Sequence, residues 1–141
     1  MKLKTFLFTL IAALIAVPIA YSAVDNWYPA NQRTVAWDAV TTLEDGTPLP
    51  EGSTVSYEVF YAKEDKTGQM SLGITSATSF TVTLPAEGKY IIGVQAIRNI
   101  VGVDPIRSTM AWSDDPTKCQ NGATFGIIFY IKPGNVGGLR G

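Results

Sequence analysis

Short runs of alternating apolar and polar residues recur along the chain from residue 33 onward, separated by clusters of glycine, proline, aspartate and asparagine. Alternation with a period of two is typical of β-strands that have one buried face. After residue 22, no stretch keeps the period of about 3.6 residues that marks an amphipathic helix. The pattern therefore predicts an all-β sandwich or barrel.

The alternation also predicts where the strands lie and which large side chains face the core. Neighbouring side chains of a strand point to opposite faces, so inward positions follow from the register of the apolar residues. We expect strands over Arg33–Val40, Thr54–Ala62, Gln69–Ile74, Ser79–Leu84, Lys89–Ile97, Ile106–Ser113 and Ala123–Ile131. Residues 98–105 are expected to connect two of them as a hairpin. The expected structural core includes Trp37, Tyr57, Leu84 and Tyr90.

The N-terminus has the three parts of a secretory signal peptide. Lys2 and Lys4 precede an apolar run over residues 6–20, and Ala20-Tyr21-Ser22 matches a small-residue cleavage site. A retained membrane anchor is the alternative, but this run is interrupted by Pro18 and falls short of the ~20 residues needed to span a bilayer. We expect residues 1–22 to be removed, leaving a secreted, periplasmic or cell-surface protein without a stable membrane span.

Cleavage after Ser22 of the 141-residue chain leaves 119 residues, which suits one domain. We place that domain at residues 23–132 and expect residues 133–141 to form a flexible tail. The remaining chain holds nine basic against 12 acidic residues, so its formal net charge changes from −1 to −3. A mildly acidic domain without a basic stripe argues against nucleic acid and anionic membranes as partners.

Histidine is absent, which excludes histidine-based triads, histidine general bases and most catalytic zinc sites. A single small domain also leaves little room for the cleft that paired carboxylates need in glycoside hydrolysis. We therefore expect no enzyme, no catalytic residue, no cofactor and no metal site. Asp104, Asp114 and Asp115 lack the spacing of a calcium loop, and the adjacent pair suits the turn before Pro116.

Three segments occur in an order that resembles the fibronectin type III family. They are TVAWDAV around Trp37, SYEVFYA around Tyr57, and SFTVTLPAEGKYIIGVQAI, in which Leu84 and Tyr90 occupy the positions of the family's corner leucine and tyrosine. The likeness covers Arg33 to Ser113. It implies an immunoglobulin-like β-sandwich of about seven strands, in a bacterial-type exported protein with a single such domain. The tyrosine hydroxyl is then expected to bond back to the backbone.

The chain departs from that family at both ends. Before the tryptophan strand it offers only Ala23–Gln32, with Pro29 in the middle, and it carries an extra C-terminal strand that is apolar on both faces. Such a strand must be covered or paired. We expect Thr124–Ile131 to fill the missing edge position, in its own molecule or in a neighbour.

Three functions remain open from the sequence. Resemblance to the family implies an interaction module that binds a protein or a cell-surface polymer. A structural subunit that assembles into a fibre or surface layer is the second, through strand addition and a bridge between chains, with candidates Cys119, Phe125, Ile127, Phe129 and Ile131. A carbohydrate-binding module is the third, since flat exposed aromatics bind sugars or proteins. The candidate binding surface consists of Trp27, Tyr28, Phe60 and Trp112.

Overall fold

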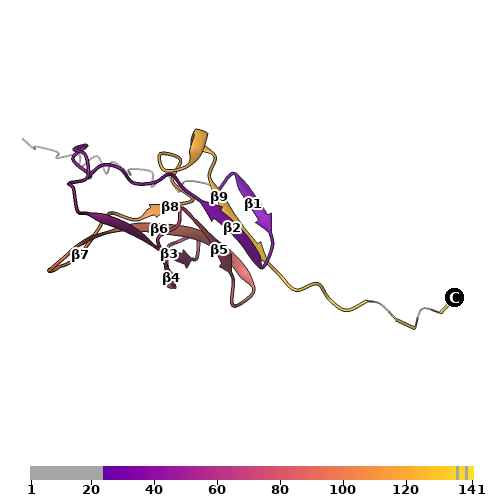
Figure 1. The fold of residues 1–141 in the computed structure, drawn as a ribbon. Coiled ribbons are helices and arrows are strands. Elements are labelled where there is room, and N and C mark those ends of the chain that lie inside the picture. The colour runs from indigo at the N-terminus through magenta and orange to yellow at the C-terminus, as the bar shows by residue number, and fades with distance from the viewer. Residues whose placement is uncertain (1–23, 136, 139) are drawn as a thin grey trace, which may run out of the picture.

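The computed structural model describes residues 24–135, 137–138 and 140–141, and nearly all its regular elements are β-strands (Figure 1). This confirms the all-β class. The expected signal peptide lies outside the described residues. The elements are β1 (Asn26–Pro29), β2 (Gln32–Ala36), β3 (Thr54–Ala62), β4 (Met70–Thr75), β5 (Ser79–Thr83), β6 (Gly88–Ile100), β7 (Val103–Arg107), β8 (Ala111–Trp112), the 3-10 helix η1 (Gln120–Gly122) and β9 (Phe125–Phe129).

The larger sheet is mixed and is built around β6, its longest strand. Its order is β1-β9-β6-β3-β4, with β1 parallel to β9 and every other pair antiparallel. One edge of β6 pairs with β3 along nine residues. The other edge pairs in succession with β9, β8 and β7. β6 is therefore the central strand, and the other strands of this sheet pair with it directly or through β3 or β9.

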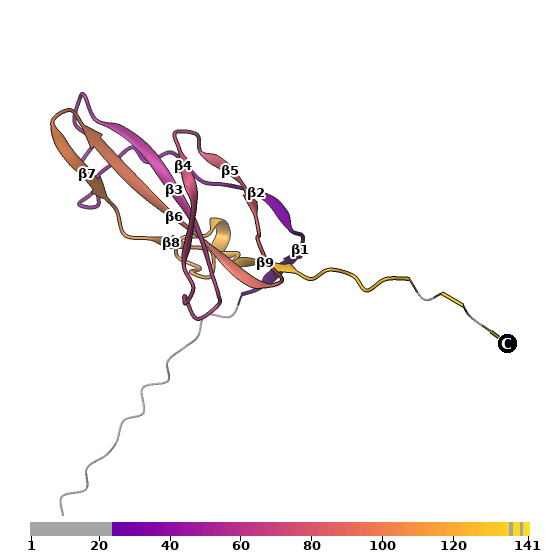
Figure 2. The same cartoon turned by 90° about the horizontal axis from the view of Figure 1, so that it is seen from below.

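The smaller sheet consists of β2 and β5, and the core lies between it and the larger sheet. Val59 and Ile127 of the larger sheet and Val82 of the smaller one are fully buried in a single apolar cluster. Figures 1 and 2 show β2 and β5 at the end of the molecule that carries β1 and β9. The hairpin of β6 and β7 projects at the opposite end.

The expected strand bounds were wrong around this hairpin and after β2. β6 continues to Ile100, so residues 98–105 are mostly strand and not a connection, and the returning strand is divided into β7 and β8. At this division the Ala96 N–H donates to the hydroxyl of Ser108 at 3.1 Å, and the Ser108 N–H donates to the carbonyl of Ala96 at 2.9 Å. β2 ends at Ala36, although the Trp37 N–H still bonds to the carbonyl of Thr78 at 3.0 Å.

The segment expected to lack a regular first strand forms β1, which is a correction. β1 pairs with β9 in register from Asn26 with Phe125 to Pro29 with Ile128. Pro29 is tolerated because it lies at the end of an edge strand, where no neighbour needs its missing N–H. β9 thus lies within its own molecule, between β1 and β6, and is shorter than the predicted Thr124–Ile131.

The residues expected in the core pack against one another. Tyr57, Leu84 and Tyr90 are buried, and the half-buried Trp37 packs its ring edge-on to Tyr57 at 5.3 Å. The Tyr90 hydroxyl donates to the carbonyl of Glu87 at 3.3 Å. The Tyr57 hydroxyl accepts the N–H of Val40 at 2.9 Å, which fixes the chain just after β2.

Candidate functional site

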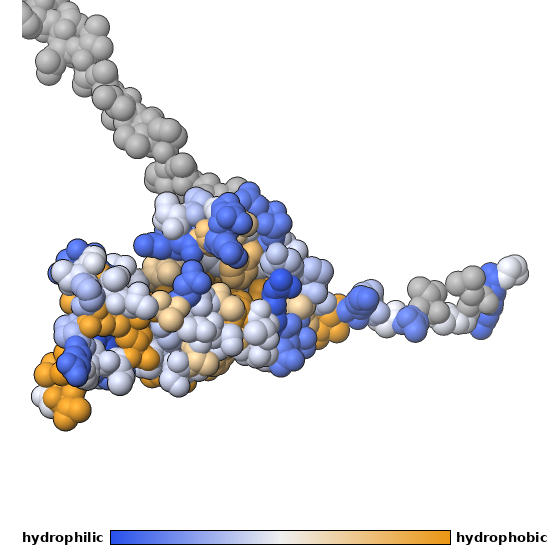
Figure 3. Space-filling model, turned by 45° about the horizontal axis from the view of Figure 1, so that its top comes forward, coloured by the Kyte–Doolittle hydropathy of each residue, from blue (hydrophilic) through white to orange (hydrophobic). Residues whose placement is uncertain are grey.

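The hairpin of β6 and β7 exposes apolar side chains at the end of the molecule. Val101 is 99% exposed, Val103 52% and Ile106 48%, and all five residues of β7 are exposed. Figure 3 shows the hairpin tip as a hydrophobic knob at the lower left of that view. Adjacent exposed apolar side chains of this kind are a feature of interaction surfaces.

Local sequence explains why the hairpin forms and why its outer edge stays unpaired. Gly102 has φ of 79°, a value that glycine adopts freely, and it closes the two-residue turn with Val101. The outer edge of β7 carries Pro105, which has no N–H, beside the charged Asp104. Proline and charge both discourage addition of another strand at an edge. The hairpin is therefore suited to contacts through its side chains.

A groove of about 510 Å³ lies at the base of the hairpin. One wall is the chain after β2, residues 39–44 with Leu49, and the opposite wall comes from β3, β6 and β7. Its apolar lining includes Leu43, Leu49, Val55 and Ile106. Because Ile106 belongs to both features, the groove and the exposed hairpin form one continuous surface, which we call the hairpin end.

Hydrogen bonds hold the outer wall of the groove in place. The Leu43 N–H donates to Thr47 at 2.7 Å, and the Leu49 N–H donates to Thr41 at 3.1 Å. Glu44 then accepts the backbone N–H of Thr109 at 2.8 Å and its hydroxyl at 3.0 Å. These two bonds lower the pKa of Glu44, so its carboxylate stays ionised.

The groove lining is cationic overall. It contains Arg98, Arg107 and Lys118 against the single carboxylate of Glu44. Arg107 forms an ion pair with Glu58 on the other face of the sheet, and Arg98 uses its Nε to donate to a serine hydroxyl at 3.1 Å. Lys118 has an exposed side chain without an ion pair among the described residues. The groove therefore suits an apolar group that carries negative charge beside it.

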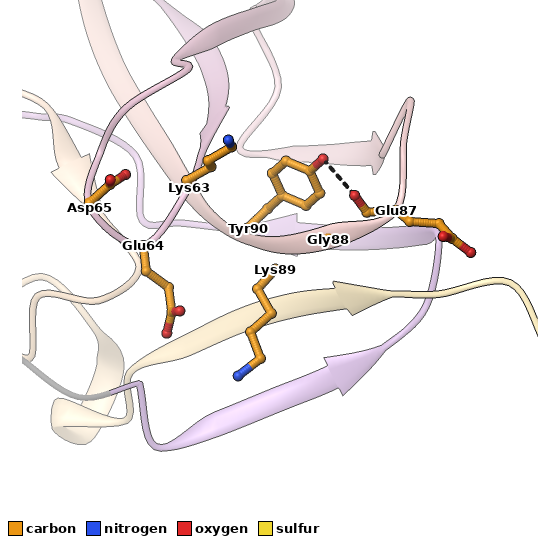
Figure 4. Close-up of a pocket in the computed structure, with 7 residues that line it drawn as sticks. All are labelled: Lys63, Glu64, Asp65, Glu87, Gly88, Lys89 and Tyr90. Atoms are coloured by element: carbon orange, nitrogen blue, oxygen red, sulfur yellow. Dashed lines mark hydrogen bonds between the residues drawn. The ribbon is translucent and has the colours of Figure 1, made fainter.

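A second cavity, of about 350 Å³, lies between the β3–β4 turn and the start of β6 (Figure 4). Charges of both signs line it, with Lys63 and Lys89 near Glu64, Asp65 and Glu87, beside Gly88 and the buried Tyr90. The pKa of Asp65 is lowered by the hydroxyl and the N–H of Thr67, which already occupy its carboxylate. The arrangement selects no charge or class of ligand.

Two of the four aromatic binding candidates cover glycines. The ring of Trp27 lies over Gly126, its register partner, so closely that a Cβ there would approach Cζ3 to 2.5 Å. The ring of Trp112 lies over Gly93 in the same way, at 2.8 Å. Both side chains are half-buried. Their close fit to the backbone gives them a structural role in the sheet.

The other two candidates do not form one surface together. Phe60 pairs in register with Gly93, so it shares the outer face of the sheet with Trp112. Tyr28 points to the opposite face, near Phe125, and the Arg33 guanidinium lies 3.4 Å from its ring centre. The structure therefore brings Phe60 and Trp112 onto one row and leaves Tyr28 apart from them.

The assembly candidates are mostly internal. Ile127 is fully buried, Phe125 and Phe129 pack against the core, and only Ile131 is largely exposed. Cys119 is half-buried, and its thiol lies 3.3 Å from the carbonyl of Ser113. Burial raises the pKa of this thiol, and nearby Asp115 and Asp114 raise it further, which lowers its reactivity.

Two of the three aspartates considered for calcium, Asp114 and Asp115, are engaged by other side chains. Asp114 is buried and pairs with Lys66 at 3.3 Å, while Asp115 accepts the N–H and hydroxyl of Thr117 in a turn. Within the described part of the chain, no group of three or more histidine, cysteine or acidic side chains is placed to hold a metal ion. The same residues include no helix long and apolar enough to cross a membrane.

Comparison of the chain with protein-family models, with curated proteins and with solved structures finds no significant match. The hairpin end is therefore identified as a candidate site from its geometry alone. Sequence reasoning missed its main residues, Val101, Val103 and Ile106. A signal was present, since Ile100-Val101-Gly102-Val103 is apolar on both sides of a glycine, where a turn is ordinarily polar.

Proposed function

We propose that this protein is an exported, non-enzymatic interaction module whose sandwich is of the fibronectin type III kind. Two features support the fold. The larger sheet contains the order β4-β3-β6-β9 and faces β2-β5, which supports an immunoglobulin-like sandwich, and Trp37 directly follows β2 while Tyr90 lies in β6. The hydroxyl of Tyr90 bonds to the backbone three residues upstream, at the corner before β6.

The observation that carries the binding function is the exposed apolar hairpin beside a groove. Loops at the ends of such sandwiches are free to vary without disturbing the core, so they commonly hold binding residues. The exposed side chains of the hairpin are valine and isoleucine, which have no flat ring on which a sugar stacks. A protein surface is therefore favoured over a carbohydrate as the partner.

Binding of the exported protein to the cell envelope tests this proposal. Fluorescently labelled protein is added to envelope preparations of the producing organism, and the bound fraction is measured against concentration, with unlabelled protein as competitor. Binding should saturate and be competed. Val101→Asp should abolish it, because the substitution adds a charge to a side chain that contacts nothing within the domain.

Ile74→Asp is the matched control. Ile74 is another exposed apolar side chain, 59% exposed, but it lies on edge strand β4, which β3 separates from β6, and it belongs to neither the hairpin nor the groove lining. This variant should bind as the unmodified protein does. Equal binding by Val101→Asp and the unmodified protein would contradict the proposal, as would binding that never saturates.

A further inference from the structure

The hairpin and the groove of one molecule are complementary in polarity. The hairpin tip presents Val101 and Val103, and the groove is lined by Leu43, Leu49 and Val55. Val101 and Val103 are exposed, and the three groove side chains are half-buried, so both sets keep apolar surface in contact with water. Burying both against each other would remove apolar surface from water on each side of the contact.

The same two features are complementary in charge. Asp104 lies on the hairpin between the exposed Val103 and Pro105 and is itself exposed, and its carboxylate has no ion pair or hydrogen bond among the described residues. The groove presents Arg98 and Lys118. An anionic group beside apolar side chains is the ligand that this groove suits, and the hairpin carries that combination.

A hairpin cannot reach the groove of its own molecule. β6 runs without a break from the core through Ile100, and its pairing with β7 carries the tip away from the body (Figure 1). The groove lies at the base, where Ile106 borders it. Contact between a hairpin and a groove therefore requires two molecules.

Resting on the proposed function, we infer that a second copy of this chain occupies the groove, with the two hairpins engaged reciprocally about a two-fold axis. Each hairpin lies in the groove of the other copy. In each of the two contacts, the hairpin valines pack against the groove leucines, and Asp104 lies near Arg98 and Lys118. Such an isologous contact closes at two copies. The formal net charge of the chain is negative, so association depends on this local pairing of opposite charges.

Analytical ultracentrifugation of the purified exported protein alone, from about 1 μM to about 1 mM, tests the inference. We expect a reversible equilibrium between monomer and dimer. Val101→Ser should weaken dimerisation about 100-fold, which is about tenfold for each of the two copies, because a buried valine is lost from both tips. Ile74→Ser should leave the dissociation constant unchanged, and at concentrations where all three proteins are monomeric both variants should unfold at the temperature of the unmodified protein.

A charge exchange identifies the partner surfaces. Asp104→Lys alone places like charges at both contacts, and so does Lys118→Glu alone, so each variant should be monomeric. Their equimolar mixture should form a heterodimer, since one contact then has the exchanged charge pair and the other has the original one. A mixture that stays monomeric would overturn the assignment of these two surfaces.

Three other results would overturn the inference. They are a monomer at all concentrations, a dimer that Val101→Ser does not weaken, and an open series of larger species, which a two-fold contact cannot produce. These outcomes are separable from the proposed function. If the protein alone is monomeric but its envelope binding still depends on Val101, the interaction module stands and the second copy is excluded as its partner.

Discussion

Replacing Gly126 by alanine tests how the edge of the large sheet is held together. The added Cβ would lie 2.5 Å from Cζ3 and 2.8 Å from Cε3 of Trp27, about 1 Å closer than carbon atoms pack. The ring cannot readily move away, because its strand is held in register with β9 and the Lys89 ammonium lies 4.9 Å from its centre. We expect β1 to be displaced from β9.

The magnitude follows from two opposing effects. Overfilling a packed contact ordinarily costs about 1–3 kcal/mol. Alanine also restricts the unfolded chain, which stabilises by about 0.4–1 kcal/mol where the backbone accepts it, and Gly126 has no positive φ that alanine would strain. The net expectation is a loss of about 1–2 kcal/mol in the free energy of unfolding. For a domain of this size, that lowers the melting temperature by roughly 4–8 °C.

Thermal unfolding followed by circular dichroism measures this effect. Gly134→Ala is the control, because a Cβ at that position meets nothing within 4 Å. In a Trp27→Ala background, Gly126→Ala should become neutral or stabilising, since the ring that it meets is gone. An equal effect of Gly126→Ala in both backgrounds would refute the packing of Trp27 on this glycine.

Three further predictions concern side-chain chemistry. Tyr57→Phe should lower the free energy of unfolding by about 1–3 kcal/mol in urea titrations, because the Val40 N–H loses its acceptor. Ser71→Ala should raise the pKa of Glu58, whose carboxylate is held ionised first by that hydroxyl and then by an arginine, as measured by carboxyl NMR. Because the pKa is lowered in the folded state, this contribution to stability is present above the ordinary glutamate pKa and is lost on acidification, so the variant should lose less stability at low pH. Cys119 should react with a thiol reagent at pH 8 more slowly in the folded protein than after denaturation, and equal rates would exclude the burial seen here.

The sequence by itself determined the class of the protein and much of its core. Alternation along the segments 54–62, 79–84 and 89–97 places Tyr57, Leu84 and Tyr90 inward, and all three are buried. This succeeds because the period of a strand is a local property: each residue fixes its own face from the residues beside it. Glycine, proline and aspartate mark the turns for the same local reason.

Only the tertiary structure decided which strands pair and which side chains they cover. β1 has a weak strand signal, yet it forms because β9, about 100 residues away, supplies its hydrogen-bond partners. Trp27 and Trp112 have the character of exposed binding aromatics until their register partners prove to be glycines with room for a ring. The backbone groups that pair strands are the same in every residue, so local composition does not specify a distant partner.

The exposure of the hairpin end was also decided by the tertiary structure. From the sequence, Ile100 to Val103 could have been a covered strand, since an apolar run does not itself show whether another element packs over it. The smaller sheet covers only the opposite end of β6, and this leaves Val101 almost wholly exposed beside a groove that residues far apart in the sequence enclose. Which face of a strand is apolar follows from neighbouring residues along the chain. Whether that face is covered depends on where distant segments of the chain pack.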